Sequence, residues 1–107
     1  MTKVKMEVNP GVCSLKTTIE AESEDMMNIV FMISSDCPHV MDLAAALKEK
    51  EITVFDAIAR PIIENKLFIE CSKHLEHAAC PIPVALVKVC EPVGGLALKR
   101  TVEFRFV

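Results

Sequence analysis

Cysteine and histidine are the residue types in this sequence that could do chemistry, and three of the five cysteines stand beside turns and prolines. Cys13 follows the turn triplet Asn-Pro-Gly at 9–11, and Cys37 and Cys80 each directly precede a proline. Proline suits the first turn of a helix, so both thiols are expected at helix N-termini. The partial positive charge there favours the thiolate and lowers the pKa of a cysteine. The structural alternative is a small residue that is tolerated beside a helix-starting proline.

The stretch Cys71-x2-His74-x2-His77-x2-Cys80 has the residue types of a zinc site, but its spacing argues against a single ion. Each three-residue step on a continuous helix turns by about 300°, so Cys71 and Cys80 would face opposite sides. We interpret Cys71 and Cys90 as core residues on apolar helix stripes, because a buried cysteine behaves as a small hydrophobe. His77 is better placed than His74 to be a ligand, although it could also cap carbonyl groups at a helix C-terminus.

The elements that must position these residues indicate an α+β protein. Alternation of apolar and polar residues is typical of strands, and the run at 29–33, apolar on both faces, predicts a central strand covered on both sides. We expect one domain over residues 1–107: a mainly antiparallel sheet of about four strands, formed by a three-strand N-terminal meander plus a C-terminal strand, with helices packed on one face. The predicted elements are strands at 3–8, 15–22, 29–33 and 101–106 and helices at 38–51, 54–59, 67–79 and 84–91.

Strand order alone predicts that two of the cysteines are neighbours. In a three-strand meander, the turn between the first two strands and the end of the third lie at the same edge of the sheet. Cys13 and Cys37 should therefore lie close together. Cys80 joins them only if the last helix starts at that edge, and the connection at 92–100 permits either direction.

Composition and charge exclude several classes of protein. The chain has 107 residues, 51% of them hydrophobic, and a formal net charge of -3 without charged blocks, so it lacks the basic surface of a nucleic-acid-binding protein. No apolar run approaches the ~20 residues that span a membrane, and no signal peptide pattern opens the sequence. We therefore expect a cytoplasmic protein with reduced thiols. The surplus of apolar residues predicts a homo-oligomer.

Two resemblances bear on these motifs. The segment Cys-Pro-Ile-Pro-Val-Ala-Leu-Val-Lys at 80–88 resembles the Cys-Pro-x-Pro helix start of the small sulfur-carrier family, whose members relay a persulfide on that cysteine. That family carries the motif after its first strand, so we interpret the match as local convergence. Over nearly the whole chain, the segments 9–13, 35–38, 77–83 and 95–98 resemble a family of small uncharacterised cysteine-containing proteins from anaerobic bacteria and methanogens, a domain of unknown function. This resemblance implies that the three cysteine-bearing segments belong together.

The leading hypothesis is a small metal-binding protein whose cysteine-rich site holds zinc, iron or an iron–sulfur cluster. The alternatives are a thiol or persulfide carrier that uses Cys80, and a structural interaction domain. No motif identifies a reaction, so an enzyme is not predicted, although a three-thiolate metal with an open position could act as a Lewis acid. The predicted ligands are Cys13, Cys37, Cys80 and His77, with His39 and His74 as candidate supporting residues.

Overall fold

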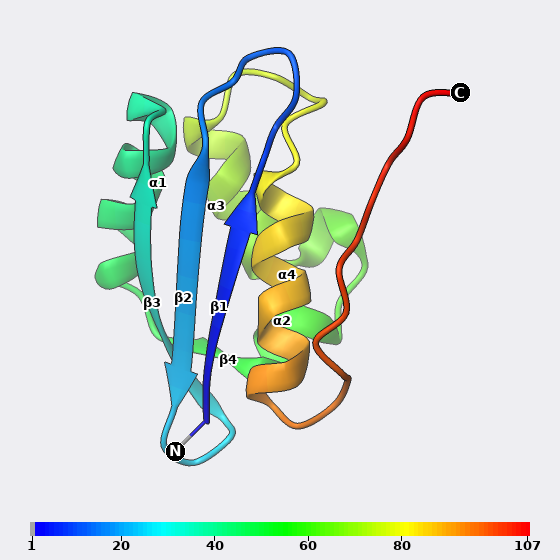
Figure 1. Ribbon diagram of the computed structural model, residues 1–107. Coiled ribbons are helices and arrows are strands. Elements are labelled where there is room, and N and C mark those ends of the chain that lie inside the picture. Colours follow the sequence, from blue (N-terminus) through cyan, green and yellow to red (C-terminus); the bar gives the residue numbers. More distant parts are fainter. Residues whose placement is uncertain (1) are drawn as a thin grey trace.

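A four-stranded antiparallel sheet forms one layer of the protein (Figure 1). The computed structural model describes residues 2–107. The strands lie in sequence order, with Val4 opposite Ala21 and Ile19 opposite Ile33. The expected α+β class and the N-terminal three-strand meander are therefore confirmed. The strands are β1 (Thr2–Val8), β2 (Thr17–Ser23), β3 (Asn28–Ser35) and β4 (Ile52–Thr53).

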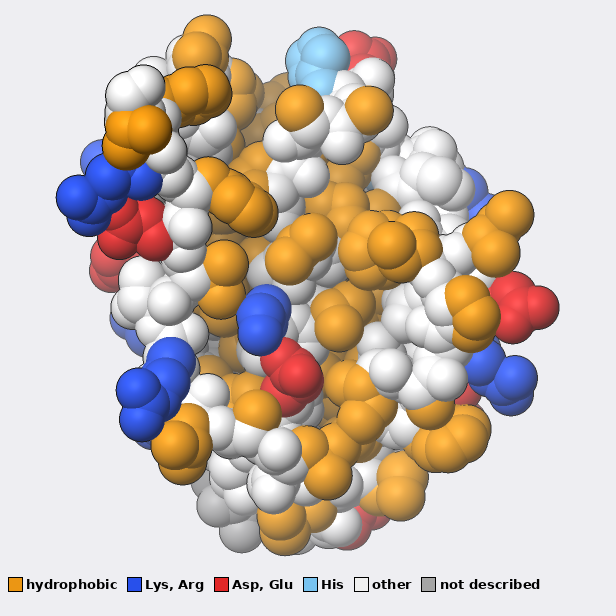
Figure 2. Space-filling view, turned by 90° about the vertical axis from the view of Figure 1, so that its right-hand side faces the viewer, with side chains coloured by type: hydrophobic (Ala, Val, Ile, Leu, Met, Phe, Trp, Pro, Cys, Tyr) orange, Lys and Arg blue, Asp and Glu red, His pale blue; other side chains and the backbone are white. Residues whose placement is uncertain are grey.

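The helices form the second layer and cover one face of the sheet (Figure 1). The helix α4 packs on β1 and β2, and α1 packs on β3. From the side on which α4 lies, the surface is largely hydrophobic (Figure 2). No helix within residues 2–107 is long and apolar enough to cross a membrane. The helices are α1 (Pro38–Lys48), α2 (Val54–Ile58), the 3-10 helix η1 (Ile62–Glu64), α3 (Lys66–His74) and α4 (Ile82–Val93).

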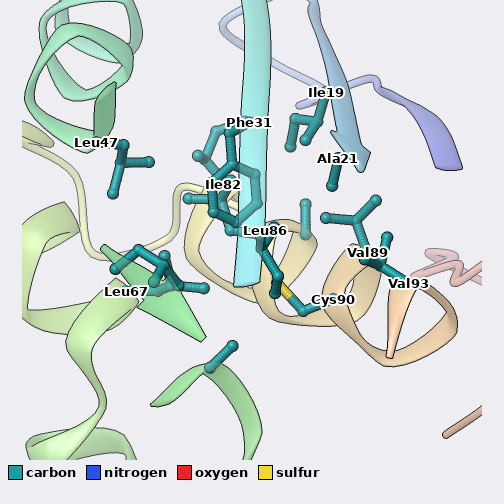
Figure 3. Close-up of a cluster of buried hydrophobic side chains, with 14 of the residues drawn as sticks. Ile19, Ala21, Phe31, Leu47, Leu67, Ile82, Leu86, Val89, Cys90 and Val93 are labelled. Carbon is teal, nitrogen blue, oxygen red and sulfur yellow. The ribbon is translucent and has the colours of Figure 1, made fainter. Parts of the chain in front are cut away.

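The core lies between these two layers. Alternate residues of β2 are buried, because period-2 side chains point to opposite faces of the sheet. Side chains of α4 point toward those of β2 and β3 (Figure 3). Complete burial of a Val, Leu or Ile side chain contributes about 1.5–3 kcal/mol to the stability of the folded state. Among the fully buried residues are Ile19, Leu43, Leu67, Leu86, Val89 and Val93.

The strand β3 differs from its prediction, because only one of its faces is covered. Ile29 and Phe31 are buried against the helices, whereas Val30 and Met32 are 58% and 38% exposed on the outer face. A run that is apolar on both faces is typical of a strand between two layers. Here no element of the described chain covers the outer face.

The fourth strand is not the C-terminal segment that alternation predicts. It is β4, which pairs with β3 through Ile52 opposite Ile29 and is too short to produce a periodic pattern. Residues 98–107 have no regular secondary structure and are exposed. The helix α3 is also shorter than predicted. It ends at His74 because Leu75 adopts an extended conformation and donates its N–H to the Cys71 carbonyl oxygen at 2.8 Å.

Candidate thiol site

Three of the five cysteines come to one end of the sheet. Cys13 lies between β1 and β2, Cys37 lies between β3 and α1, and Cys80 lies between α3 and α4. Figure 1 shows the β1–β2 and α3–α4 connections at the end where β3 stops and α1 starts. The structure therefore places Cys13 and Cys37 at the same end of the sheet, as strand order predicts. The direction of α4, which the sequence leaves open, brings Cys80 to this end too.

Cys13 is held in a tight and exposed turn. Gly11 has a φ of 85°, which glycine adopts without steric cost. Its N–H donates to Asn9 Oδ1 at 3.2 Å, and the N–H of Ser14 donates to the Gly11 carbonyl oxygen at 3.0 Å. Ser14 also has a positive φ of 59°. The Cys13 side chain is thus presented to solvent from a turn with a defined backbone.

Cys37 is the N-cap residue of α1 and is half-buried against the core. Its side chain makes no capping hydrogen bond, so the thiol does not serve as the cap of the helix. Its N–H donates to Ser35 Oγ at 3.1 Å, and that hydroxyl lies 2.6 Å from Thr17 Oγ1 of β2. The thiol is therefore positioned by a polar link across the ends of two adjacent strands.

Cys80 ends the turn that reverses the chain between α3 and α4. Its N–H donates to the His77 carbonyl oxygen at 3.1 Å. Burial raises the pKa of Cys80, the N–H of Ile82 lowers it by donating to the sulfur, and the nearby Cys37 and Cys13 raise it. The net shift is upward, so the prediction of a thiol activated by a helix N-terminus is wrong for Cys80. Burial against the core outweighs the hydrogen bond from the Ile82 N–H.

Cys80 lies near both Cys37 and Cys13, since each of them raises its pKa, so the three thiols gather at this end of the sheet. A negative charge on Cys37 or Cys13 disfavours ionisation of Cys80, since like charges repel. Within residues 2–107, no three His, Cys, Asp or Glu side chains are arranged to hold a metal ion directly. The thiols are neighbours without yet forming a ligand cage.

Cys71 and Cys90 are buried core residues, as their places on apolar helix stripes predict. Burial raises the pKa of each thiol to about 12. Burial has the largest effect at Cys71, and the charge of the nearby Cys80 adds to it. The continuous helix from Cys71 to Cys80 that the spacing argument considers is not present, because α3 stops at His74 and the chain then turns.

The three histidines occupy different positions around this end. His77 is exposed and lies in the same turn as Cys80. His39 Nε2 lies 3.7 Å from Glu76 Oε1, which connects the start of α1 to the α3–α4 connection. His74 Nε2 lies 3.7 Å from Glu70 Oε2 within α3. His77 therefore shares a turn with Cys80, and His39 lies in the first turn of α1, whose N-cap residue is Cys37.

Glu70 is a buried polar residue that the sequence does not single out. Its carboxylate is bound by Lys73 at 2.9 Å and Lys50 at 3.3 Å. The hydrogen bond from Lys73 lowers the pKa of Glu70 against the opposing effect of burial. The spacing of three between Glu70 and Lys73 is the one signal that could have found it. A shallow cleft of about 330 Å³ lies here and is lined by Lys50, Glu51, Lys66, Ile69 and Glu70, with none of the three clustered cysteines among its lining residues.

Fold and site together define a small α+β protein with a three-thiol cluster at one end of its sheet. The chain matches the model of DUF6951, a family of unknown function, over residues 4–106, and it belongs to that family. The expected membership of an uncharacterised family is thereby confirmed. No curated protein and no solved structure matches the chain.

Proposed function

We propose that Cys13, Cys37 and Cys80 bind a soft metal ion, zinc or iron, with His77 as the fourth ligand. The observation that carries the proposal is that three separate connections bring three thiols to one end of the sheet, with Cys80 near both Cys37 and Cys13. The two remaining cysteines are buried in the core, so the thiols divide into a clustered set and a structural set. Three thiolates and one imidazole are a common donor set for tetrahedral zinc.

The raised pKa of Cys80 is consistent with a ligand role. Metal-bound cysteine is a thiolate, and a cation offsets the repulsion that opposes ionisation of neighbouring thiols. Binding would therefore release protons and would be weaker at low pH. Since the three thiols do not form a ligand cage as they stand, the exposed turn that carries Cys13 must close on Cys37 and Cys80 when an ion binds.

The second candidate function is a thiol or persulfide carrier that uses Cys80. The hydrogen bond from the Ile82 N–H to the Cys80 sulfur favours it, because such a bond stabilises the thiolate that a carrier needs. Burial of Cys80 has the opposite effect on its pKa. A carrier also needs no contribution from Cys13 or Cys37, and therefore leaves the three-thiol cluster without a role.

The metal proposal is tested on protein purified without oxygen and stripped with a chelator. Titration with Co²⁺, which reports thiolate ligands through charge-transfer absorption, should show one ion per chain. Cys13→Ser, Cys37→Ser and Cys80→Ser should each weaken binding strongly and reduce the charge-transfer intensity. His77→Ala should weaken binding while the thiolate absorption persists. Cys90→Ala, a matched loss of a cysteine in the core, should leave binding unchanged.

Two results would overturn the metal proposal. One is the absence of thiolate-to-metal absorption in the intact protein. The other is binding that survives Cys80→Ser at full affinity. Loss of a persulfide signal in Cys80→Ser, with Cys13→Ser and Cys37→Ser behaving as wild type, would instead support the carrier.

A further inference from the structure

The C-terminal segment, Thr101–Val107, has the sequence of a β-strand but no strand partner. Apolar and polar residues alternate along it, with Glu103 and Arg105 on the polar side. Alternation of this kind, rich in aromatic and β-branched residues, favours a half-buried strand. The residues of its apolar side are Val102, Phe104 and Phe106.

This segment extends away from the rest of the protein. Across residues 2–107, the last backbone hydrogen bond toward the C-terminus is the one that Leu96 donates to Glu91. Phe104 and Phe106 are each at least 84% exposed. Figure 1 shows the segment as an extended strand-like stretch, with α4 between it and β1. Contiguous apolar side chains exposed in this way mark an interaction site.

The turn after α4 sets the direction in which the segment leaves. The N–H groups of Gly94 and Gly95 donate to the carbonyl oxygens of Cys90 and Pro92, both at 3.0 Å. Gly94 packs so closely on α2 that a Cβ would lie 2.6 Å from Val54 Cγ1. After this turn the chain runs along the side of α4 away from β1, so the segment lies apart from its own β1 (Figure 1).

The strand β1 offers an edge that this segment fits. It is an outer strand of the sheet and pairs only with β2, which leaves its other side without a partner within the described chain. Both the segment and β1 have seven residues. An unpaired edge strand is a ready template for a strand from another chain.

Side-chain chemistry selects a parallel register for this pairing. With Thr101 opposite Lys3, Glu103 comes opposite Lys5 and Arg105 comes opposite Glu7 on the exposed face, so both charged pairs are complementary. The apolar side chains then continue the core-facing side of β1 toward α4, on a face where hydrophobic side chains gather around a few charged ones (Figure 2). That side of β1 consists of Val4, Met6 and Val8.

We propose that the C-terminal segment of one copy adds to the free edge of β1 in a second copy, and that the exchange is reciprocal in a two-fold symmetric dimer. The same surface then serves both partners, as two-fold symmetry requires. Each copy buries its three apolar side chains and loses one exposed sheet edge. The proposal is independent of the thiol site.

Sedimentation equilibrium in the presence of a chelator tests the dimer. The intact chain should have twice the chain mass of 11.8 kDa, and removal of 101–107 or the double change Phe104→Asp and Phe106→Asp should reduce it to the monomer mass. Val30→Asp places the same charge on another exposed apolar residue and should leave the dimer intact. A monomeric intact chain, or a dimer that survives the truncation, would overturn the proposal.

Engineered disulfides distinguish exchange between copies from folding back. Lys5→Cys and Glu103→Cys are made in separate, differently sized chains, each with Cys13→Ser to remove the exposed native thiol. On mild oxidation the mixture should give a crosslink that contains both chains. A double variant that instead crosslinks within a single chain, with no product from the mixture, would show that the segment pairs with its own β1.

Discussion

Asn65 should be one of the most important polar residues for stability. Its side chain is buried and joins two helices: Oδ1 accepts from the N–H groups of Leu67 at 2.9 Å and Phe68 at 3.1 Å, and Nδ2 donates to the Ala57 carbonyl oxygen at 2.6 Å. The first two bonds cap α3, and the third ties α3 to the end of α2. Asn65→Ala removes all three bonds.

The cost of Asn65→Ala has two parts. Loss of an N-cap costs about 1 kcal/mol. The Ala57 carbonyl oxygen also loses its buried donor, and an unsatisfied buried polar group costs about 1–3 kcal/mol. We therefore expect the free energy of unfolding to fall by about 2–4 kcal/mol, a large part of the roughly 5–15 kcal/mol available to a domain.

Urea unfolding followed by circular dichroism measures this loss. The midpoint should decrease while the slope stays unchanged, because a changed slope would indicate a different denatured state. Thr53→Ala is the matched control: Thr53 caps α2 by accepting from the Asp56 N–H at 3.0 Å, at a half-buried position. It should cost only about 1 kcal/mol. An Asn65→Ala variant no less stable than Thr53→Ala would refute the contribution assigned to the Ala57 carbonyl.

Two further predictions concern the thiols. Alkylation followed by peptide mass spectrometry should modify exposed Cys13 first, half-buried Cys37 and Cys80 more slowly, and Cys71 and Cys90 only on unfolding; early modification of Cys90 would contradict the assigned core. The folded state keeps Cys71 and Cys90 protonated from their ordinary pKa of 9.0 up to about 12, whereas the unfolded chain ionises them. Stability is therefore lost as pH rises through this range, by up to about 1.4 kcal/mol per pH unit for each thiol. Urea midpoints that stay constant over this range would contradict it.

The fold is predictable from sequence where the pattern is local. Alternation locates β1 and β2, and the buried positions Thr17, Ile19 and Ala21 are those that a period of two predicts. The prediction that β3 is covered on both faces is wrong at Val30 and Met32. Apolar residues on both faces of a strand do not show whether a second layer exists to cover the outer face. The two-residue β4 is set by its pairing with β3 rather than by its own sequence.

The candidate site is predictable only as far as topology determines it. A meander brings Cys13 and Cys37 together whatever the helices do, whereas the position of Cys80 depends on the direction of α4. The sign of the Cys80 pKa shift is also beyond a sequence argument. A helix N-terminus lowers a thiol pKa, but the sequence does not reveal that Cys80 is packed against the core, and this burial has the larger effect.

The alternation at 101–106 illustrates the same distinction between local pattern and partner. A sequence that is typical of a strand favours pairing, but it does not show which sheet edge the strand pairs with. In one copy of the chain, the segment lies apart from the edge of β1, with α4 between them (Figure 1). The predicted strand can then be correct as a local tendency and absent from a single chain, because a second copy supplies the missing edge. Changes at Phe104 or Phe106 touch none of the three clustered thiols, so the dimer and the metal site can fail or succeed separately.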